Sequence, residues 1–394
     1  MGYLLCLCLP AFGNEVTGFF TDPALKPFPK AVVEFTAPDT DFPAARRFDV
    51  TAKGTFRLDP GPSRVFILKF RAAYCAPRTV MVYLPKDGPL KLDVRLTPYS
   101  WVDDFKDVRV VGDFNGFDFT TGVPLRALSD GTWFADVESK TDGLMAYGLA
   151  RLVRGDPVTV PGTSDELALD SNGDYVSRLK VKPGRVRIVF DPALLPRVFG
   201  KSEVIFEHPD STTDKVAAIY DEMLQRQMGH LLALQAFMAG RRDFKDFHYD
   251  WRTEVDALKR RIGSEKDDLA RQALWIALLD LRRLGSAEVD PAAARKALKA
   301  VPPESELWRL GVQYLVFDTI RLAGGLERYR EYFERVITRN PSRVVRAYTL
   351  ERGYLVARRD KDEARSRRYY KLLTEEYGDL VAGQRVKGMP PAVK

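Results

Sequence analysis

The period of the hydrophobic positions changes once along the chain, near Ser211. Before that residue, short apolar or alternating runs are separated by Pro and Gly, which is the pattern of strands and turns. The first seven runs lie at 16–20, 31–35, 46–50, 55–58, 65–70, 79–84 and 90–96. Seven strands in about eighty residues predict a small β-sandwich over residues 15–98.

A second β-domain is predicted over residues 99–196. It begins with the alternating segment VRVVGDFNGFDF, in which Gly112 gives the backbone freedom for a turn. The short polar side chains of Asp113 and Asn115 suit hydrogen bonds to the backbone of that turn. Further strands are predicted in GTWFADVE, LMAYGLARLV, 175–181 and 186–190, with a strong turn at DSNGD. We expect Phe114 and Trp133 in the core of this domain.

From Ser211 on, apolar residues recur at helical spacing, and Ser211, Thr212 and Thr213 are good capping residues for a first helix that reaches Gly240. Short connections between many helices predict a stack of α-hairpins over residues 211–380. Residues 197–210 are expected to be a linker, and residues 381–394 a tail or linker. The further helices are predicted at 250–262, 268–284, 291–300, 305–322, 326–338, 343–358 and 362–377.

The last hairpin resembles one tetratricopeptide-type unit. Its sequence is NPSRVVRAYTLERGYLVARRDKDEARSRRYYKLLTEEYGD, with Tyr369, Leu373 and Tyr377 on one stripe. The period of about 34 residues is not cleanly repeated upstream, which indicates a degenerate array. Such a stack either binds a peptide or protein in a concave groove or only packs as a helical cap. The fold class expected is therefore a multidomain β + α chain: two consecutive β-sandwiches followed by an all-α, tetratricopeptide-like helical-hairpin stack.

The positive charge of the chain is concentrated in the helical half. The chain has 394 residues and a net charge of +7, but the basic excess is concentrated within residues 321–371. We expect Arg358, Arg359, Arg365 and Arg368 to form a surface for a protein partner. An acidic protein surface or anionic lipid headgroups would suit such a patch, whereas the alternation of arginines with acids disfavours nucleic acid.

The N-terminal residues 1–14 resemble a truncated secretory signal peptide. The run YLLCLCLPAF is apolar, too short to span a membrane, and ends in small residues and a turn, although no Lys or Arg precedes it. This favours a periplasmic or secreted protein. A buried first strand in a cytoplasmic protein is the alternative. Once the segment is removed, Cys75 is the only thiol left, so no internal disulfide is expected.

Known catalytic and metal motifs are missing from the sequence. His208, His230 and His248 lack metal-ligand spacing, and there is no Cys-x-x-Cys, phosphate loop or Gly-x-Ser-x-Gly elbow. His248 lies beside Asp246 and Asp250, which suits either an acid–base cluster or a capped helix start. We therefore expect no catalytic, metal or cofactor residues, and a binding or scaffold role for protein partners.

The first sandwich resembles the carboxypeptidase-regulatory-like module. The resemblance rests on a Val-Thr-Gly opening, a Pro-rich loop before AVVEF, and the segment KGTFRLDPGPSRVFILKF. It implies a structural or adhesive domain and adds no chemistry.

The second sandwich resembles the glycogen-binding, immunoglobulin-like module of AMP-activated protein kinase β-subunits and isoamylase-type enzymes. The segments that carry the resemblance are VRVVGDFNGF, PLRALSDGTWFADVE, MAYGLARLVRGDPV and LDSNGDYVSRLKV. It implies sugar binding on an aromatic platform, for which Phe117, Asn115 and Asn172 are the candidates. The family's lysine falls at Gly148, its second tryptophan near Pro157 and Val158, and its asparagine near Val176. Binding of α-glucan is therefore kept as an alternative function.

The helical half also resembles the region that precedes a thioredoxin-like domain in bacterial envelope proteins. The segment EEYGDLVAGQRVKGMPPAVK carries this likeness. It implies a further alternative, the non-catalytic N-terminal part of an envelope thiol-disulfide oxidoreductase, although the sequence has no Cys-x-x-Cys to perform that exchange.

Overall fold

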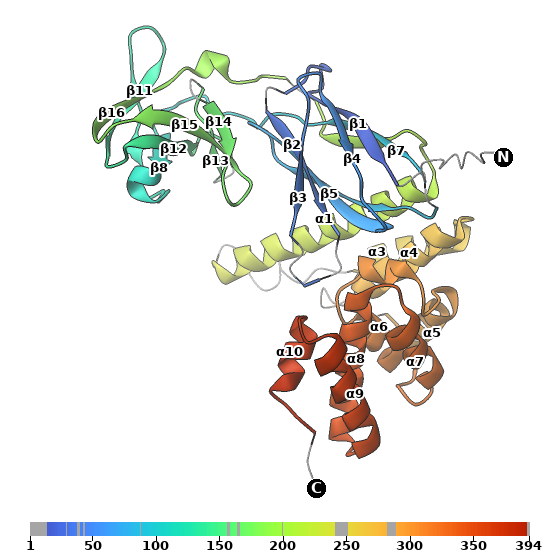
Figure 1. The fold of residues 1–394 in the computed structure, drawn as a ribbon. Helices are drawn as coiled ribbons and strands as arrows, with labels where there is room; N and C mark the ends of the chain where they lie inside the picture. Colours follow the sequence, from blue (N-terminus) through green and yellow to red (C-terminus); the bar gives the residue numbers. More distant parts are fainter. Residues whose placement is uncertain are drawn as a thin grey trace, which may run out of the picture.

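The computed structural model confirms the predicted order, with β-sheets in the first half of the chain and helices in the second (Figure 1). It describes residues 14–391, apart from residues 29, 38–39, 42–43, 87, 156–157, 164–165, 199, 241–250 and 282–288. Residues 1–13 and His248 lie outside the described residues, so the signal-peptide and acid–base predictions that involve them stay predictions.

The first sandwich consists of two four-stranded sheets, in the orders β17-β7-β1-β4 and β3-β2-β5-β6. Their inner faces bury Phe20, Phe66 and Phe70 completely. All neighbouring strands are antiparallel except β1 and β7, which run parallel. The strands are β1 (Val16–Thr21), β2 (Ala31–Thr36), β3 (Arg46–Asp49), β4 (Thr55–Leu58), β5 (Val65–Ala72), β6 (Arg78–Tyr83), β7 (Leu90–Arg95) and β17 (Glu203–Phe206).

The edge strand β17 comes from the segment 197–210, which we expected to be a linker. It pairs antiparallel with β7, with Val204 opposite Val94, and its Phe206 is buried in the first sandwich. Only four residues, EVIF, form the strand, between Pro196 and Pro209, so the sequence pattern is too short to stand out. The second sandwich is therefore inserted between two neighbouring strands of the first.

The second sandwich packs a sheet of order β14-β15-β12-β8-β9, with β13 on β12, against the sheet β10-β11-β16. Tyr147 and Phe190 are fully buried between them, and Trp133 packs at 5.8 Å, centroid to centroid, on Phe105. Trp133 and Phe114 both lie against this core, as expected. The strands are β8 (Arg109–Gly112), β9 (Val123–Pro124), β10 (Arg126–Ala127), β11 (Trp133–Ser139), β12 (Gly143–Ala150), β13 (Thr159–Val160), β14 (Glu166–Leu169), β15 (Tyr175–Val181) and β16 (Gly184–Phe190).

Arg71 links a buried ion pair of the first sandwich to the second sandwich. Arg71 Nε donates to Glu34 Oε2 over 2.7 Å, while Arg71 Nη1 lies 3.2 Å from Asp174 Oδ1 in the DSNGD turn of the second sandwich. Gly173 in that turn has φ of 83°, and a Cβ there would lie 3.0 Å from atoms of both Arg71 and Glu34. The hydroxyl of Tyr74 adds a hydrogen bond of 2.7 Å to the carbonyl of Gly162. These contacts fix one sandwich against the other.

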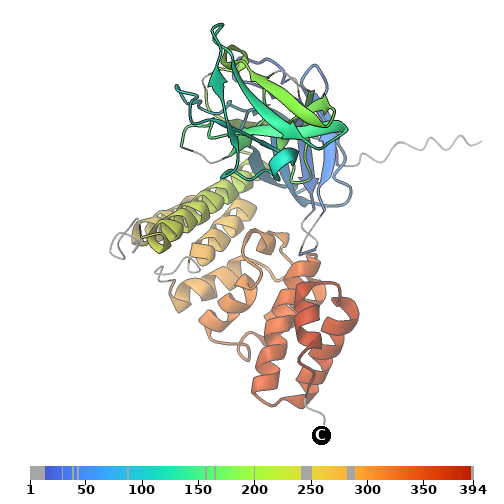
Figure 2. The same cartoon turned by 90° about the vertical axis from the view of Figure 1, so that its left-hand side faces the viewer.

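The helical half begins with α1 (Thr212–Met238), and Ser211 caps it through a side-chain hydrogen bond from Asp214 N. The first half of α1 lies on the outer face of the sheet β3-β2-β5-β6, where Val216 and Met223 share a core with Met81 (Figure 2). The chain then continues through α3 (Arg252–Ser264), α4 (Asp268–Leu281), α5 (Pro291–Ala300), α6 (Leu315–Ala323), α7 (Arg330–Arg339), α8 (Arg343–Arg359), α9 (Glu363–Glu376) and α10 (Val381–Lys387).

Two predicted elements of the helical half differ in the structure. The helix expected over 305–322 is broken: a 3-10 turn over Glu306–Leu310 is followed by an extended Gly311, and α6 starts only at Leu315. The tail expected from residue 381 begins as the helix α10, because Ala382 and Val386 are buried against the stack. Trp308, Tyr354 and Tyr369 are fully buried in that stack.

Candidate binding site

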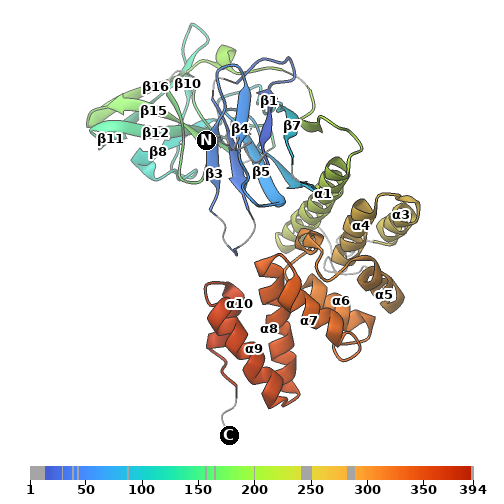
Figure 3. The ribbon, with the colours of Figure 1, turned by 45° about the vertical axis from the view of Figure 1, so that its right-hand side comes forward.

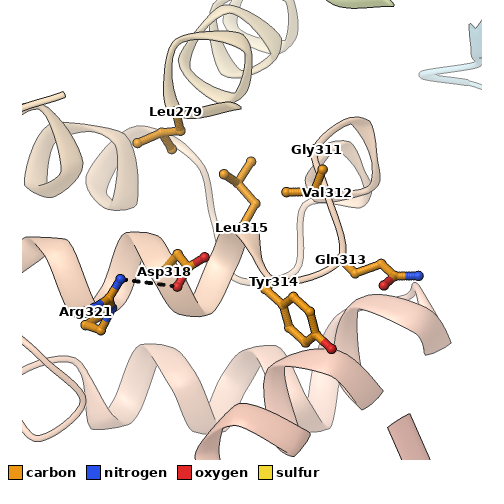
Figure 4. Close-up of a pocket in the computed structure, with 8 residues that line it drawn as sticks. All are labelled: Leu279, Gly311, Val312, Gln313, Tyr314, Leu315, Asp318 and Arg321. Atoms are coloured by element: carbon orange, nitrogen blue, oxygen red, sulfur yellow. Dashed lines mark ion pairs between the residues drawn. The ribbon is translucent and has the colours of Figure 1, made fainter. Parts of the chain in front are cut away.

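A cavity of about 720 Å³ lies in the helical stack between the end of α4, the segment 311–314 and α6 (Figure 4). Its volume is within the range of ligand and peptide-anchor sites in proteins. The lining residues are Leu279, Gly311, Val312, Gln313, Tyr314, Leu315, Asp318 and Arg321. We call this cavity the α4–α6 groove.

The break after Leu310 creates the groove. Gly311 is extended, and a Cβ at this position would overlap the side chain of Leu315, which is only 5% exposed. A side chain at residue 311 would therefore require Leu315 to move where the segment passes close to α6. If the helix had continued through residue 311, the segment 311–314 would not line a cavity beside α4.

The floor of the groove is apolar and its rim is polar. Leu279 from α4 and Leu315 from α6 are buried, and Val312 completes the floor. Gln313 is exposed at the rim (Figure 4). At the other side, Arg321 Nη2 lies 3.8 Å from Asp318 Oδ1, and these side chains are 66% and 49% exposed to solvent. An apolar floor with a few polar groups at the edge suits an apolar anchor flanked by polar or charged groups.

Tyr314 connects the groove to a polar cluster between α6, α8 and α10. Its hydroxyl donates to Glu351 Oε2 over 3.2 Å and accepts a hydrogen bond from Arg385. The guanidinium of Arg352 lies 3.8 Å from the centroid of the Tyr314 ring, and Tyr348 packs edge-on at 5.3 Å. These contacts hold the ring at the wall of the groove in one orientation.

Glu351 is the buried acid of that cluster, with 3% of its surface exposed. Burial raises the pKa of its carboxyl, and the hydrogen bonds and charges of Arg385 and Tyr314 only partly offset that effect. Burial also raises the pKa of Tyr314. The cluster therefore favours a neutral tyrosine, and a charged Glu351 carries a desolvation penalty in the folded protein.

Neither a metal-ligand cluster nor a reactive thiol accompanies the groove among the described residues. Within them, no group of three His, Cys, Asp or Glu side chains could hold a metal ion. The one described cysteine, Cys75, is buried in the first sandwich, and burial raises the pKa of its thiol, which disfavours the nucleophilic thiolate. No helix in the described part of the chain is long and apolar enough to cross a membrane.

The predicted sugar-site residue Asn115 holds its own loop. Its Oδ1 accepts from Gly112 N over 2.9 Å, and its Nδ2 donates to the carbonyl of Asp118 over 2.9 Å and to Thr121 Oγ1 over 3.2 Å. Phe117 is half-buried in the same loop, with φ of 58°. The side chain of Asn115 thus has its hydrogen-bonding groups engaged within the loop.

The third predicted sugar residue, Asn172, lies at the opposite end of the same sheet. Gly112 pairs with Tyr147, and Tyr147 pairs with Ser177 on the next strand. The strands β8 and β15 run in the same direction along the sheet. The Phe117 loop follows the end of β8, whereas Asn172 precedes the start of β15, so the two lie in opposite directions from this row. At ~3.3 Å per residue, the distance between Asn172 and the Phe117 loop exceeds the width of one sugar ring. The structure therefore does not bring Asn172 together with Asn115 and Phe117.

Most of the predicted arginine surface is paired within the chain. Arg365 Nη1 lies 2.7 Å from Glu327 Oε1, and Arg368 Nη2 lies 2.8 Å from Glu334 Oε2 on α7. Arg359 pairs with the adjacent Asp360 over 2.9 Å, and Arg358 is exposed at the end of α8. Arg365 and Arg368 tie α9 to its neighbours, so three of the four arginines have acidic partners within the chain.

The sequence did not single out Tyr314, Leu279 or the other residues of the groove. We predicted one helix through this region, and the only signal against it was Gly311 within the pattern. Reading that glycine as a break would have placed Val312, Gln313 and Tyr314 in a loop between helices.

Comparison with known proteins gives only a distant likeness. No protein-family model matches the chain, and no curated protein is significantly similar to it. A DUF3823 family protein from Parabacteroides merdae is 13% identical, with a TM-score of 0.19, over 45% of this chain and 80% of its own. A protein from Bacteroides uniformis described as a candidate carbohydrate-binding protein is 11% identical, with a TM-score of 0.18, over 46% and 80%. A streptococcal ancillary pilin is 9% identical, with a TM-score of 0.21, over 51% and 60%. At TM-scores this low, the likeness supports no conclusion about function.

Proposed function

We propose that this chain is a non-catalytic binding protein and that a segment of a protein partner occupies the α4–α6 groove. The observation that carries the proposal is the cavity of about 720 Å³ with an apolar floor and a polar rim in a stack of helical hairpins. Stacks of this kind present binding surfaces along their helices.

The groove favours a partner with an apolar anchor residue. Leu279, Val312 and Leu315 offer hydrophobic contacts for such an anchor, and burying it contributes roughly 1.5–3 kcal/mol. Gln313 and Arg321 at the rim can hydrogen-bond the backbone or an acidic side chain of the same segment. The arginines of α8 and α9 have a smaller role than the sequence led us to expect, because three of the four are ion-paired.

A periplasmic or secreted location and the division into two sandwich domains and a helical domain remain part of this proposal. Sequencing the N-terminus of the mature protein tests the location. Loss of the YLLCLCLPAF segment is expected, and an intact Met1 in a cytoplasmic fraction would contradict it.

The groove is tested with a random peptide library displayed on phage and panned against the immobilised full chain. We expect enriched peptides that share an apolar residue. Their affinity is expected to fall about tenfold or more for Val312→Glu, which places a charge on the apolar floor.

Arg367→Glu is the matched control, because Arg367 is an exposed residue of α9 outside the groove and the substitution also adds a carboxylate. It should bind the peptides as the wild type does. Circular dichroism establishes that both variants are folded. Equal affinity for the wild type and Val312→Glu would overturn the assignment of the groove.

A further inference from the structure

The second half of α1 carries an apolar stripe that continues beyond the first sandwich. Near its start, this face of α1 packs on the sandwich: Ala217 is buried in its core, and Asp221 pairs with Arg78 over 2.8 Å. The same face then presents Leu224, Met228, Leu231, Gln235 and Met238, spaced alternately by four and three residues. This spacing is the seam of a helix that packs along another helix. We call these five residues the α1 stripe.

The stripe is exposed in the single chain. Met228 is 51% exposed, Leu231 43% and Met238 78%, and the neighbouring Leu232 is 58% exposed. Charged residues make up 29% of the chain, yet residues 227–240 contain none. A contiguous uncharged apolar surface of this kind on a folded protein marks a contact with another molecule.

The stripe is complementary to itself. In an antiparallel pair of helices centred on Leu231, Leu224 lies opposite Met238, and Met228 and Gln235 lie within one residue of facing each other, in both directions. This is the condition for an isologous, two-fold interface, in which the same patch serves both subunits. We propose that the α1 stripe is the interface of a homodimer in which two α1 helices pack antiparallel about Leu231.

A second copy fits the stripe better than a charged partner does. With no charge between residues 227 and 240, nothing in the stripe can select an acidic or basic surface, and two copies meet without like-charge repulsion. Gln235 is the one polar group in the seam, and a polar seam residue fixes the register of paired helices at some cost in stability. Centring on Leu231 lets each Gln235 amide reach the edge of the seam beside Met228.

The pairing is expected to be weak and concentration-dependent. Leu224 to Met238 spans about two heptads, which is marginal for an isolated coiled coil. Here the first half of each α1 is already fixed against its sandwich through Val216 and Met223, so forming the helix adds no cost at association.

The test is sedimentation of the full chain over a wide range of concentrations. We expect the wild type to shift from monomer to dimer, and Leu231→Glu to raise the dissociation constant at least tenfold, because it places two carboxylates at the centre of the pair. Gly229→Glu is the matched control. Gly229 lies off the stripe, and a Cβ there has no atom within 4 Å, so this variant should dimerise as the wild type does.

A second measurement covers the case in which Leu231→Glu perturbs the helix. Oxidation of Leu231→Cys is expected to give a disulfide-linked dimer faster than oxidation of Gly229→Cys. A wild type that is monomeric at every concentration would overturn the proposal, as would a dimer that Leu231→Glu leaves intact. Binding of the monomeric chain to phosphatidylglycerol vesicles through the same stripe would also overturn it, in favour of a lipid-binding face.

Discussion

Asp41, in the loop between β2 and β3, accepts a hydrogen bond from the hydroxyl of Tyr348 in α8, 307 residues further along the chain. Its second carboxylate oxygen accepts from Val381 N at the start of α10 over 2.6 Å. Leu380, the N-cap residue of α10, offers no side-chain cap, so Asp41 supplies it from the other half of the molecule. One acidic residue thus joins the first sandwich to the end of the helical stack (Figure 3).

Asp41→Ala is expected to loosen α10. The change removes both hydrogen bonds and leaves the hydroxyl of Tyr348, a residue 1% exposed, without its acceptor. Losing such a bond costs about 1–3 kcal/mol. Hydrogen exchange measured by mass spectrometry should therefore speed up in residues 381–387. Asp104→Ala, an exposed aspartate of the second sandwich, is the control and should change nothing there.

The buried Arg71–Glu34 ion pair of the first sandwich gives a second prediction. Arg71→Met is expected to lower the free energy of unfolding by about 3–5 kcal/mol, because it removes the buried guanidinium that pairs with the Glu34 carboxylate and leaves it the half-exposed Arg47. The double variant Glu34→Met with Arg71→Met should regain part of that loss, since no buried charge is left unpaired. Urea unfolding followed by tryptophan fluorescence measures the free energy of unfolding of the single and the double variant. If both variants lose the same free energy relative to the wild type, Glu34 is not a buried, paired carboxylate.

The same carboxylate predicts a dependence on pH. Burial alone would raise the pKa of Glu34, but the hydrogen bonds and charges of Arg71 and Arg47 more than offset it, so the pKa is lowered from 4.5. A carboxyl whose pKa is lower when folded contributes stability above its unfolded value, and that stability is lost as the pH falls through the lowered folded value. The wild type should therefore lose stability below about pH 4.5 more steeply than Glu34→Gln. If the free energy of unfolding falls with pH in the same way for the wild type and Glu34→Gln, Glu34 does not contribute this stability.

The edge strand β17 gives a third prediction about the fold. Glu207 N donates to the carbonyl of Lys91 over 3.1 Å, so by the two-residue period the amide of Ile205 also faces β7. Ile205→Pro removes that donor, whereas Ile205→Ala shortens the side chain and keeps it. We expect Ile205→Pro to lower the thermal midpoint more than Ile205→Ala does. If the two variants melt together, the pairing of β17 with β7 contributes little.

The periodic features of the sequence were sufficient to predict β-structure in the first half of the chain, helices in the second, and most of the individual elements. The Ser211 cap and the change from alternating to helical spacing located the start of α1, because both are local properties. The role of segment 203–206 was missed, since a four-residue edge strand depends on β7, over a hundred residues earlier, and not on its own pattern. The broken helix at Gly311 was missed because the apolar spacing continues through the break, and a single glycine was the signal against a continuous helix.

The candidate site was harder to predict from the sequence than the fold was. Asn115, Phe117 and Asn172 came from a family resemblance, and the strand register separates Asn172 from the other two. The arginines of α8 and α9 were chosen by charge alone, whereas Glu327 and Glu334, which pair with two of them, lie more than thirty residues upstream. The groove is defined by the packing of α4 against α6, so no single stretch of sequence predicts it.

Hydrogen exchange of the full chain with and without an enriched peptide tests the central claim most directly. Binding at the α4–α6 groove predicts slower exchange in residues 311–321, which contain the groove segment and the first turns of α6, and no change there for Val312→Glu. Slower exchange in residues 108–119 with none in 311–321 would instead place binding on the loop of the second sandwich and would contradict the account.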